Sequence, residues 1–414
     1  MINVLSVISE LYFGGGENRL LNFARTIDPA RFSLTLATLY SFDRTSAANW
    51  GSMHSQFEEA GVKVVDLGLP RPGNRRIRRL ARMADTTAIL ATAVSKLRRL
   101  IASMRIDVVD AHLESALYTA VPAAASMTVP AAITLYSEPV LWKMAAAKQP
   151  GTDMLRSAVR RFNLRLCGAV FTDSDVRAAE LSRFIGRLSP PVQVIPNGVR
   201  LGSPRRPRGE ILNDFDIPAN TQATILGQVA GLVPFKGQAV LLDAAANILK
   251  KGADVYVLCI GYPRQGPSYP LQLQDQAAKL GISSRVRIRA YPGDIADVWD
   301  AIDIHVHASS LDSLPNAIIE GMSLGKPAVV SAVGGIPDHV ENGRTGIVVP
   351  PENPVALAEA LLRLLGNDGY AKQLGLAAYQ RYLQHFTPGN TTAQLERCFD
   401  RLVQTHRSRR AVYN

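Results

Sequence analysis

The chain has 414 residues, of which 47% are hydrophobic and 20% are charged, and its formal net charge is +11 at pH 7. This length exceeds that of one typical core and favours two domains of about 200 residues. No apolar run reaches the ~18 residues that span a bilayer, so no membrane-spanning segment is expected. The positive net charge favours partners rich in negative charge, such as nucleotide phosphates or an anionic membrane. The sequence contains no nucleic-acid-binding signature, so nucleic acid is not an expected partner.

The few cysteines predict neither a disulfide framework nor a metal site. Cys167, Cys259 and Cys398 are odd in number and far apart, which favours a reducing, cytoplasmic setting. The opening residues, MINVLSVIS, run directly into a predicted strand and lack a basic region and a cleavage site. We therefore expect no signal peptide there.

The first half alternates apolar runs with amphipathic stretches. An amphipathic helix is predicted over 16–27, another around 53–61, and arginine-rich helices later. Strands separated by helices indicate parallel pairing with right-handed crossovers, which is a Rossmann-like domain. The predicted strands lie at 2–9, 31–40, 62–68, 106–111, 130–136 and 168–174.

Residues 192–209 interrupt this pattern and predict a linker, because proline, glycine and arginine are dense there. A second α/β domain begins at 223. Its strands are predicted at the start of that domain and over 255–261, 286–291 and 302–308, and further helices follow from Val355. No internal repeat or low-complexity segment is present.

The most informative stretch is 301–341. A short apolar strand ends near Ser309, and a helix is predicted to begin between Ser313 and Pro315, where proline suits a first turn. The N–H groups of such a turn attract anions. Asp312 stands before this helix and Glu320 lies within it. Because an ionised carboxylate only accepts hydrogen bonds, hydroxyl groups of a sugar or ribose are its natural partners beside an anion site.

This stretch resembles the donor-binding motif of family 4 retaining glycosyltransferases of the GT-B fold. The resemblance rests on an acidic residue, seven intervening residues and a glutamate, together with PNAIIEGMSLGKPAVVS and VGGIPD. It implies an α/β protein with two facing Rossmann-like domains, parallel sheets and a deep interdomain cleft. The alternative is an ordinary strand–helix–strand unit in which Glu320 is a solvated helix residue.

The resemblance implies a division into an acceptor-binding domain and a donor-binding domain. The first would comprise residues 1–198, joined by a C-terminal helix over about 391–414, and the second residues 199–390. In the donor domain, Asp312 would bind sugar hydroxyls and Glu320 ribose hydroxyls. The other donor-binding candidates there are Lys236 on the diphosphate, Gly261 near the nucleotide, Tyr291 at the base, and Ser310 and Asn316 at phosphate.

Candidates in the first domain follow three predicted strands. Gly15 and Gly16 resemble a GGxE loop near the donor phosphates or the acceptor, and His112 resembles a strand-end histidine of the family. The alternative for His112 is a buried histidine bonded to local backbone. Where many members carry a histidine, this chain has Tyr136, followed by Glu138 as a possible substitute; both are catalytic candidates together with His112 and Asp312.

The chain also departs from the family at Gly231, where members usually carry an arginine that grips the diphosphate. His305 and His307 share one strand face, but no third metal ligand is nearby, and no metal site is expected.

A basic stretch precedes a long helix and contains Arg75, Arg76, Arg78, Arg79 and Arg82. One interpretation is adsorption to an anionic membrane surface that carries a lipid-linked acceptor. The other is a solvated helix, which is usual for runs of charge.

The resemblance implies a retaining, metal-independent hexosyltransferase that uses a UDP-, GDP- or ADP-sugar as donor substrate, with no tightly bound cofactor and a saccharide or lipid-linked acceptor. Polysaccharide, glycolipid or glycoconjugate biosynthesis in the cytoplasm, or at the inner membrane face, would be its setting. Two rival hypotheses are a sugar-nucleotide epimerase on the same scaffold and a nucleotide-sugar-binding protein with little activity.

Overall fold

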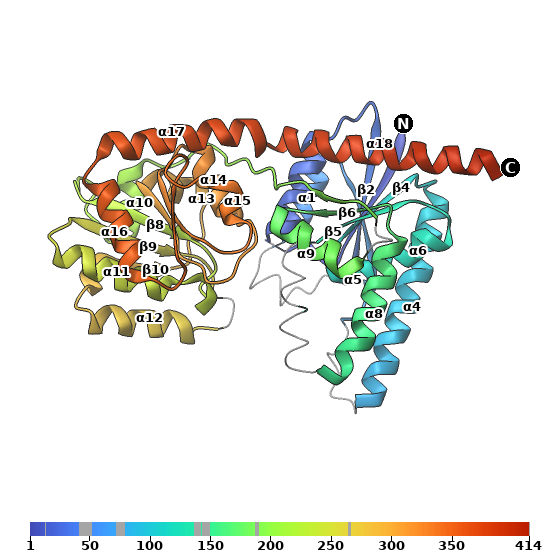
Figure 1. Ribbon diagram of the computed structural model, residues 1–414, viewed down its shortest axis with the longest axis horizontal. Helices are drawn as coiled ribbons and strands as arrows, with labels where there is room; N and C mark the ends of the chain where they lie inside the picture. Colours follow the sequence, from blue (N-terminus) through green and yellow to red (C-terminus); the bar gives the residue numbers. More distant parts are fainter. Residues whose placement is uncertain are drawn as a thin grey trace. The chain divides into compact units, whose positions relative to one another are not determined.

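The computed structural model describes residues 1–12, 14–40, 52–71, 79–135, 142, 150–186, 190–263 and 266–413. They form two compact units (Figure 1), of which unit 1 comprises Met1–Gly198 with Pro388–Asn414 and unit 2 comprises Val199–Thr387. Within these residues, no helix is long and apolar enough to cross a membrane.

Unit 1 is built on a sheet of seven parallel strands in the order β3-β2-β1-β4-β5-β6-β7. The strands are β1 (Ile2–Ile8), β2 (Phe32–Tyr40), β3 (Lys63–Leu69), β4 (Val108–His112), β5 (Ala131–Thr134), β6 (Ala169–Thr172) and β7 (Val192–Val194). The helices are α1 (Gly15–Thr26), α3 (His54–Glu59), α4 (Arg79–Ser103), α5 (Leu113–Leu117), α6 (Ala120–Ser126), α8 (Pro150–Leu166), α9 (Asp175–Ile185) and α18 (Pro388–Tyr413).

Both faces of this sheet are buried, as the continuous apolar strands predict. Successive side chains of β1 enter different cores because they point to opposite faces of the sheet. Leu5 and Val7 pack in one apolar cluster, whereas Val4 and Ile8 pack in the other. The predicted parallel, Rossmann-like arrangement is thus confirmed.

The last helix, α18, packs along α1 (Figure 1). Phe399 is fully buried against the rings of Phe23 and Phe171. Arg407 forms an ion pair with Asp107 at 2.8 Å. The helix is therefore an integral part of unit 1 although it follows unit 2 in sequence.

Unit 2 contains six strands in the order β10-β9-β8-β11-β12-β13, and all neighbours are parallel. They are β8 (Thr224–Val229), β9 (Val255–Ile260), β10 (Val286–Arg289), β11 (Ile304–His307), β12 (Ala328–Ser331) and β13 (Ile347–Val349). The helices are α10 (Arg208–Asp214), α11 (Gln238–Lys250), α12 (Ser268–Lys279), α13 (Ile295–Ala301), α14 (Asn316–Ser323), α15 (Ile336–His339), α16 (Pro354–Leu365) and α17 (Asp368–His385), with short 3-10 turns η1 (Pro234–Lys236) and η2 (Ser283–Arg285).

Two element boundaries differ from the predictions, although the boundary between the two units, at Gly198 and Val199, falls within the predicted linker. Residues 192–209 do not form a continuous linker, because Val192–Val194 pair with β6 and complete the sheet of unit 1. The helix expected to begin between Ser313 and Pro315 begins at Asn316, and Pro315 is its N-cap residue in an extended conformation. Asp312 still precedes this helix and Glu320 still lies within it.

Candidate functional site

At the carboxyl ends of β8, β9 and β11, two glycines let the backbone pass very closely. A methyl group on Gly261 would lie 1.9 Å from the carbonyl oxygen of Ala230, and one on Gly237 would lie 2.0 Å from that of Ala308. Gly237 also has a φ of +72°, which side chains disfavour. The turn that carries Lys236 is therefore fixed against the end of β11, at the sheet edge where parallel α/β proteins bind ligands.

A compact polar network occupies this edge. The carboxylate oxygen Oδ2 of Asp312 accepts from Lys236 Nζ at 2.5 Å, from His307 Nε2 at 2.9 Å and from Ser309 Oγ at 3.0 Å. His307 and Ser309 are fully buried. Lys236 and Asp312, for which the sequence predicts different ligands, are thus bonded to each other.

The surroundings set the charges in this network. Burial alone would raise the pKa of Asp312, but the hydrogen bond from His307 and the charge of Lys236 hold it well below its usual range. Burial lowers the pKa of His307, although its bond to Asp312 opposes that shift. The network consequently contains an ionised carboxylate, supported by a neutral imidazole.

Glu320 lies on α14 in a different environment. Its Oε2 accepts a hydrogen bond of 2.9 Å from the indole Nε1 of Trp299. Burial raises the pKa of Glu320 to about 7, and the indole bond opposes that shift only in part. The hydrogen-bond donor to Glu320 is therefore an uncharged indole, and no lysine or arginine of the described residues forms an ion pair with its carboxylate. With a pKa of about 7, Glu320 changes charge near neutral pH.

The two phosphate candidates lie in the loop after β11, where Ser310 is found, and at the start of α14, where Asn316 is found. The backbone N–H of Ser310 donates to the carbonyl of Phe235 at 2.9 Å, which ties the loop after β11 to the Lys236 turn. This bond removes the Ser310 amide as a ligand for phosphate. Asn316 is the first residue of α14.

Tyr291, the base-pocket candidate, lies two residues after the end of β10 and lines a groove of unit 2. Its hydroxyl is 3.4 Å from Arg206 Nη1 and 3.4 Å from Asp297 Oδ2, and its ring packs 6.0 Å from that of Phe215. Burial raises the pKa of this phenol. The groove is lined by Arg205, Arg206, Asp214, Phe215, Arg289, Ala290, Tyr291, Pro292, Gly293, Asp294 and Asp297.

Two buried glutamines, which the sequence analysis did not single out, hold the turn around Gly231. Gln238 Nε2 donates to the Gly231 carbonyl at 3.0 Å, and Gln228 Nε2 donates to the Lys236 carbonyl at 2.5 Å. The sequence analysis noted His307, which supports Asp312, beside His305 but gave it no function, and it did not single out Trp299, which supports Glu320. A histidine or tryptophan in an apolar run is typical of a core, so the sequence carried no stronger signal for them.

In unit 1, His112 ends β4 and is buried to all but 2% of its surface. Its Nε2 lies 2.7 Å from Asp110 Oδ2, which also accepts from Ser6 Oγ at 3.0 Å. His112 is thus buried, as the alternative interpretation expects, but its described partner is the side chain of Asp110 rather than the backbone. Leu113 follows with a φ of +67°, which is costly for leucine and commonly found at functional sites.

Gly15 and Gly16 begin α1, directly after Gly14 as its N-cap. A methyl group on Gly14 would lie 2.3 Å from Glu17 Oε2, so that carboxylate folds back over the helix start. An anion approaching this end would meet a negative charge. Arg19, further along α1, is buried and donates through Nη1 to the Ile195 carbonyl at 2.9 Å.

Several predictions fall outside the described residues. These are Tyr136, Glu138, Arg75, Arg76 and Arg78, as well as the side chains of Arg79 and Arg82. Among the described residues, no cluster of three or more histidine, cysteine, aspartate or glutamate side chains is placed to hold a metal ion.

Two family models match most of the chain. The model described as Glycosyltransferase Family 4 matches residues 13–202, and the model described as Glycosyl transferases group 1 matches residues 223–367.

Curated relatives carry the name D-inositol 3-phosphate glycosyltransferase. One from Corynebacterium diphtheriae is 32% identical over 44% of this chain and 42% of its own length. Another, from Streptomyces bingchenggensis, is 30% identical over 50% of this chain and 48% of its own length. The match thus spans about half the length of these relatives.

Solved structures match over nearly the whole chain. A glycosyltransferase from Rickettsia africae has a TM-score of 0.76 at 17% identity, covering 97% of this chain and 98% of its own. Anabaena Alr3699/HepE in complex with UDP and glucose has a TM-score of 0.74 at 21% identity, covering 97% and 100%. At these identities the likeness establishes the fold, which is GT-B. With both sheets, the strand-end motif and the two family models in agreement, the chain belongs to the family 4 glycosyltransferases.

Proposed function

We propose that the protein moves a sugar from a nucleotide diphosphate sugar to an acceptor hydroxyl, with retention at the anomeric carbon. The observation that carries this proposal is the pairing of Lys236 with the ionised Asp312 at the strand edge before α14. A cation that can release its carboxylate to meet a diphosphate, and a carboxylate then free to accept hydroxyls, are the two functions that a sugar donor requires.

Each group has a part in this proposal. Lys236 and the first amides of α14 would stabilise the departing diphosphate without a metal. Asp312 would accept from the donor sugar and Glu320 from the ribose, while Tyr291 would border the base and Gly261 would admit the nucleotide. Asp312 is held in its ionised form, because the hydrogen bond from His307 and the charge of Lys236 keep its pKa low.

In the reaction, the bond between the sugar C1 and the phosphate oxygen breaks, and a bond from C1 to the acceptor oxygen forms. The acceptor proton passes to the departing diphosphate. No carboxylate is singled out as a covalent nucleophile, so retention would follow from attack on the side that the leaving group vacates. His112, held by Asp110, would fix the reacting sugar.

We assign donor binding to unit 2 and acceptor binding to unit 1, with Gly15, Gly16, Tyr136 and Glu138 as further acceptor-side or sugar-side candidates. Because an Anabaena protein of this fold is seen with UDP and glucose, UDP-hexoses are the first donors to test. GDP- and ADP-sugars follow. A lipid-linked or saccharide acceptor would place the protein in glycolipid, polysaccharide or glycoconjugate synthesis.

A peripheral membrane location in the cytoplasm is part of this proposal. On α8, large apolar side chains are exposed at helical spacing: Leu155 to 70%, Val159 to 41% and Phe162 to 63%. Arg156 and Arg161 are exposed on the same helix. An apolar stripe beside arginines suits an anionic lipid surface. Loss of sedimentation with anionic vesicles in Leu155→Ser/Phe162→Ser, but not in Leu271→Ser on α12, would support this.

The transferase proposal is tested with a panel of nucleotide sugars and sugar acceptors. Release of nucleotide diphosphate that depends on both an acceptor and Glu320 would support it. Donor interconversion without acceptor would favour an epimerase. Tight binding of UDP, GDP or ADP without turnover on any acceptor would favour a nucleotide-sugar-binding protein, which the Gly231 replacement makes the more pertinent rival.

A further inference from the structure

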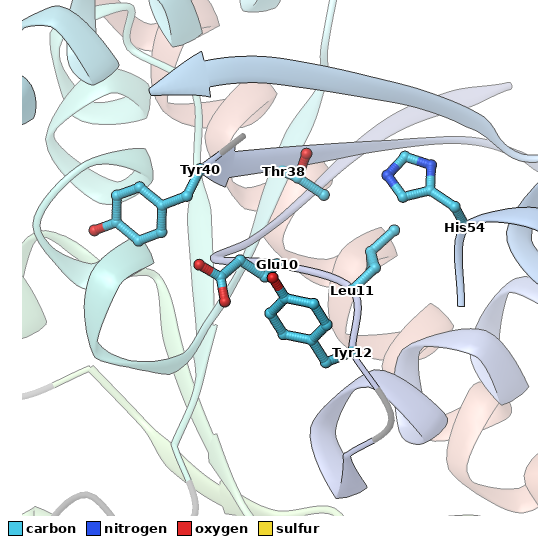
Figure 2. Close-up of a pocket in the computed structure, with 6 residues that line it drawn as sticks. All are labelled: Glu10, Leu11, Tyr12, Thr38, Tyr40 and His54. Atoms are coloured by element: carbon cyan, nitrogen blue, oxygen red, sulfur yellow. The ribbon is translucent and has the colours of Figure 1, made fainter. Parts of the chain in front are cut away.

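Unit 1 contains a small cavity lined mainly by polar side chains, at the carboxyl ends of β1, β2 and β3. Figure 2 shows its six lining side chains: Glu10, Leu11 and Tyr12 after β1, Thr38 and Tyr40 on β2, and His54 at the start of α3. The segments are fastened by backbone bonds, since Tyr40 N–H donates to Ser9 and Met53 N–H donates to Leu11, both at 3.1 Å. The cavity is small and admits about one water-sized group.

Arg71, which follows β3, neutralises this site. It binds Glu10 with two bonds, from Nε to Oε1 at 2.5 Å and from Nη2 to Oε2 at 2.7 Å. The same Nη2 donates to the Tyr12 hydroxyl at 2.8 Å, and the guanidinium lies 5.5 Å from the centre of the Tyr12 ring. A register shift between β2 and β3, with Gly68 at a φ of +63°, accompanies this placement of Arg71 after β3.

One wall of the cavity carries a polar group without a partner. Thr38 is 2% exposed, and its Oγ1 has no hydrogen-bond partner in the described part of the chain. A buried hydroxyl without a partner destabilises the folded protein, and a hydrogen bond to a ligand group would offset that cost. The Tyr12 hydroxyl accepts from Arg71, so its own proton is directed elsewhere.

We propose that this cavity anchors one hydroxyl group of an uncharged polyhydroxyl acceptor, a saccharide or polyol. This inference rests on the proposed function for its biological role. Thr38 and Tyr12 would donate to or accept from the ligand hydroxyl, and the Tyr12 and Tyr40 rings would border its carbon skeleton. Phosphate is disfavoured, because Arg71, the arginine in contact with this cluster, is already matched by the Glu10 carboxylate.

The test measures binding directly, so that it does not depend on turnover. The full chain is mixed with two matched pairs, glucose with glucose 6-phosphate and myo-inositol with its 3-phosphate, and binding is followed by saturation-transfer NMR. We expect the uncharged member of at least one pair to bind more tightly than its phosphate. Thr38→Val and Tyr12→Phe should each weaken that binding about tenfold.

The control is Thr35→Val. Thr35 lies on the same strand and is similarly buried, but it does not line the cavity. Preference for the phosphorylated members, no binding of either uncharged sugar, or equal effects of Thr35→Val and Thr38→Val would each overturn the inference. If uncharged sugars bind as expected and no nucleotide sugar is turned over, the cavity stands and the transferase proposal falls.

Discussion

Unit 1 and unit 2 each hold a buried histidine–aspartate pair with a serine at the carboxyl edge of a parallel sheet. In unit 1, Asp110 accepts from His112 and Ser6. In unit 2, Asp312 accepts from His307 and Ser309, and also from Lys236. The histidine and the serine are common to both sites, and Lys236 is the difference.

The order of residues along the chain inverts the roles. Asp110 is inside β4 and His112 ends it, so the aspartate supports a histidine that is presented at the edge. His307 is the last residue of β11, and Asp312 follows in the loop before α14, so the histidine supports an aspartate. The same pair of residue types thus positions an imidazole at the sheet edge in unit 1 and an ionised carboxylate there in unit 2.

The largest expected effect comes from removing the lysine that distinguishes the pairs. Lys236→Met should lower kcat/KM for transfer by about 10³, because leaving-group charge would lose its cation. Steady-state release of nucleotide diphosphate measures this. Lys279→Met, in an exposed pair on α12, is the control. A loss of less than tenfold would mean that Lys236 only balances Asp312.

The second-largest effect is expected from His112, the histidine at the end of β4. His112→Ala should lower kcat about 10²-fold through misplacement of the reacting sugar, whereas nucleotide binding by calorimetry should stay unchanged. Weakened nucleotide binding in parallel with the loss of kcat would contradict the assignment of His112 to the sugar.

Glu320 extends the comparison to a buried acid that lacks a lysine. Its described hydrogen-bond donor is the uncharged indole of Trp299, whereas Asp312 accepts from Lys236. Burial raises the pKa of Glu320 from 4.5 to about 7, so its protonated form favours folding. That contribution is complete below pH 4.5 and is lost as the pH rises through 7. From pH 5 to pH 8, Glu320→Gln should therefore gain about 2 kcal/mol in free energy of unfolding relative to the unchanged protein.

Chemical denaturation at both pH values measures that difference. Comparing the two proteins cancels the opposite contribution of His305 and His307, whose pKa values burial lowers. A constant difference between the two proteins across this range would show that Glu320 stays ionised.

The smallest effect tests the supporting histidine. His307→Asn should raise the donor KM about tenfold, because Asp312 would lose one orienting hydrogen bond. The effect should vanish in an Asp312→Asn background if His307 acts only through Asp312. Additive losses in the double variant would give His307 a separate role.

The sequence predicted the two parallel α/β architectures well, because apolar runs at strand length separated by amphipathic helices permit few other arrangements. It missed β7, since three residues beside prolines, glycine and arginines read as a linker. The pairing of Val192–Val194 with β6 is a tertiary contact that local pattern does not encode.

The site divides in the same way. The sequence predicted correctly that Asp312 precedes the helix near Pro315 and that Glu320 lies within it, because one loop and one helix contain all three residues. The bond from Lys236 to Asp312 joins residues 76 positions apart, and the bonds from Arg71 to Glu10 join residues 61 positions apart. The sequence by itself therefore determined the fold class and which residues to suspect. Only the tertiary structure decided which charges neutralise each other, because parallel strands bring their distant carboxyl ends to one edge.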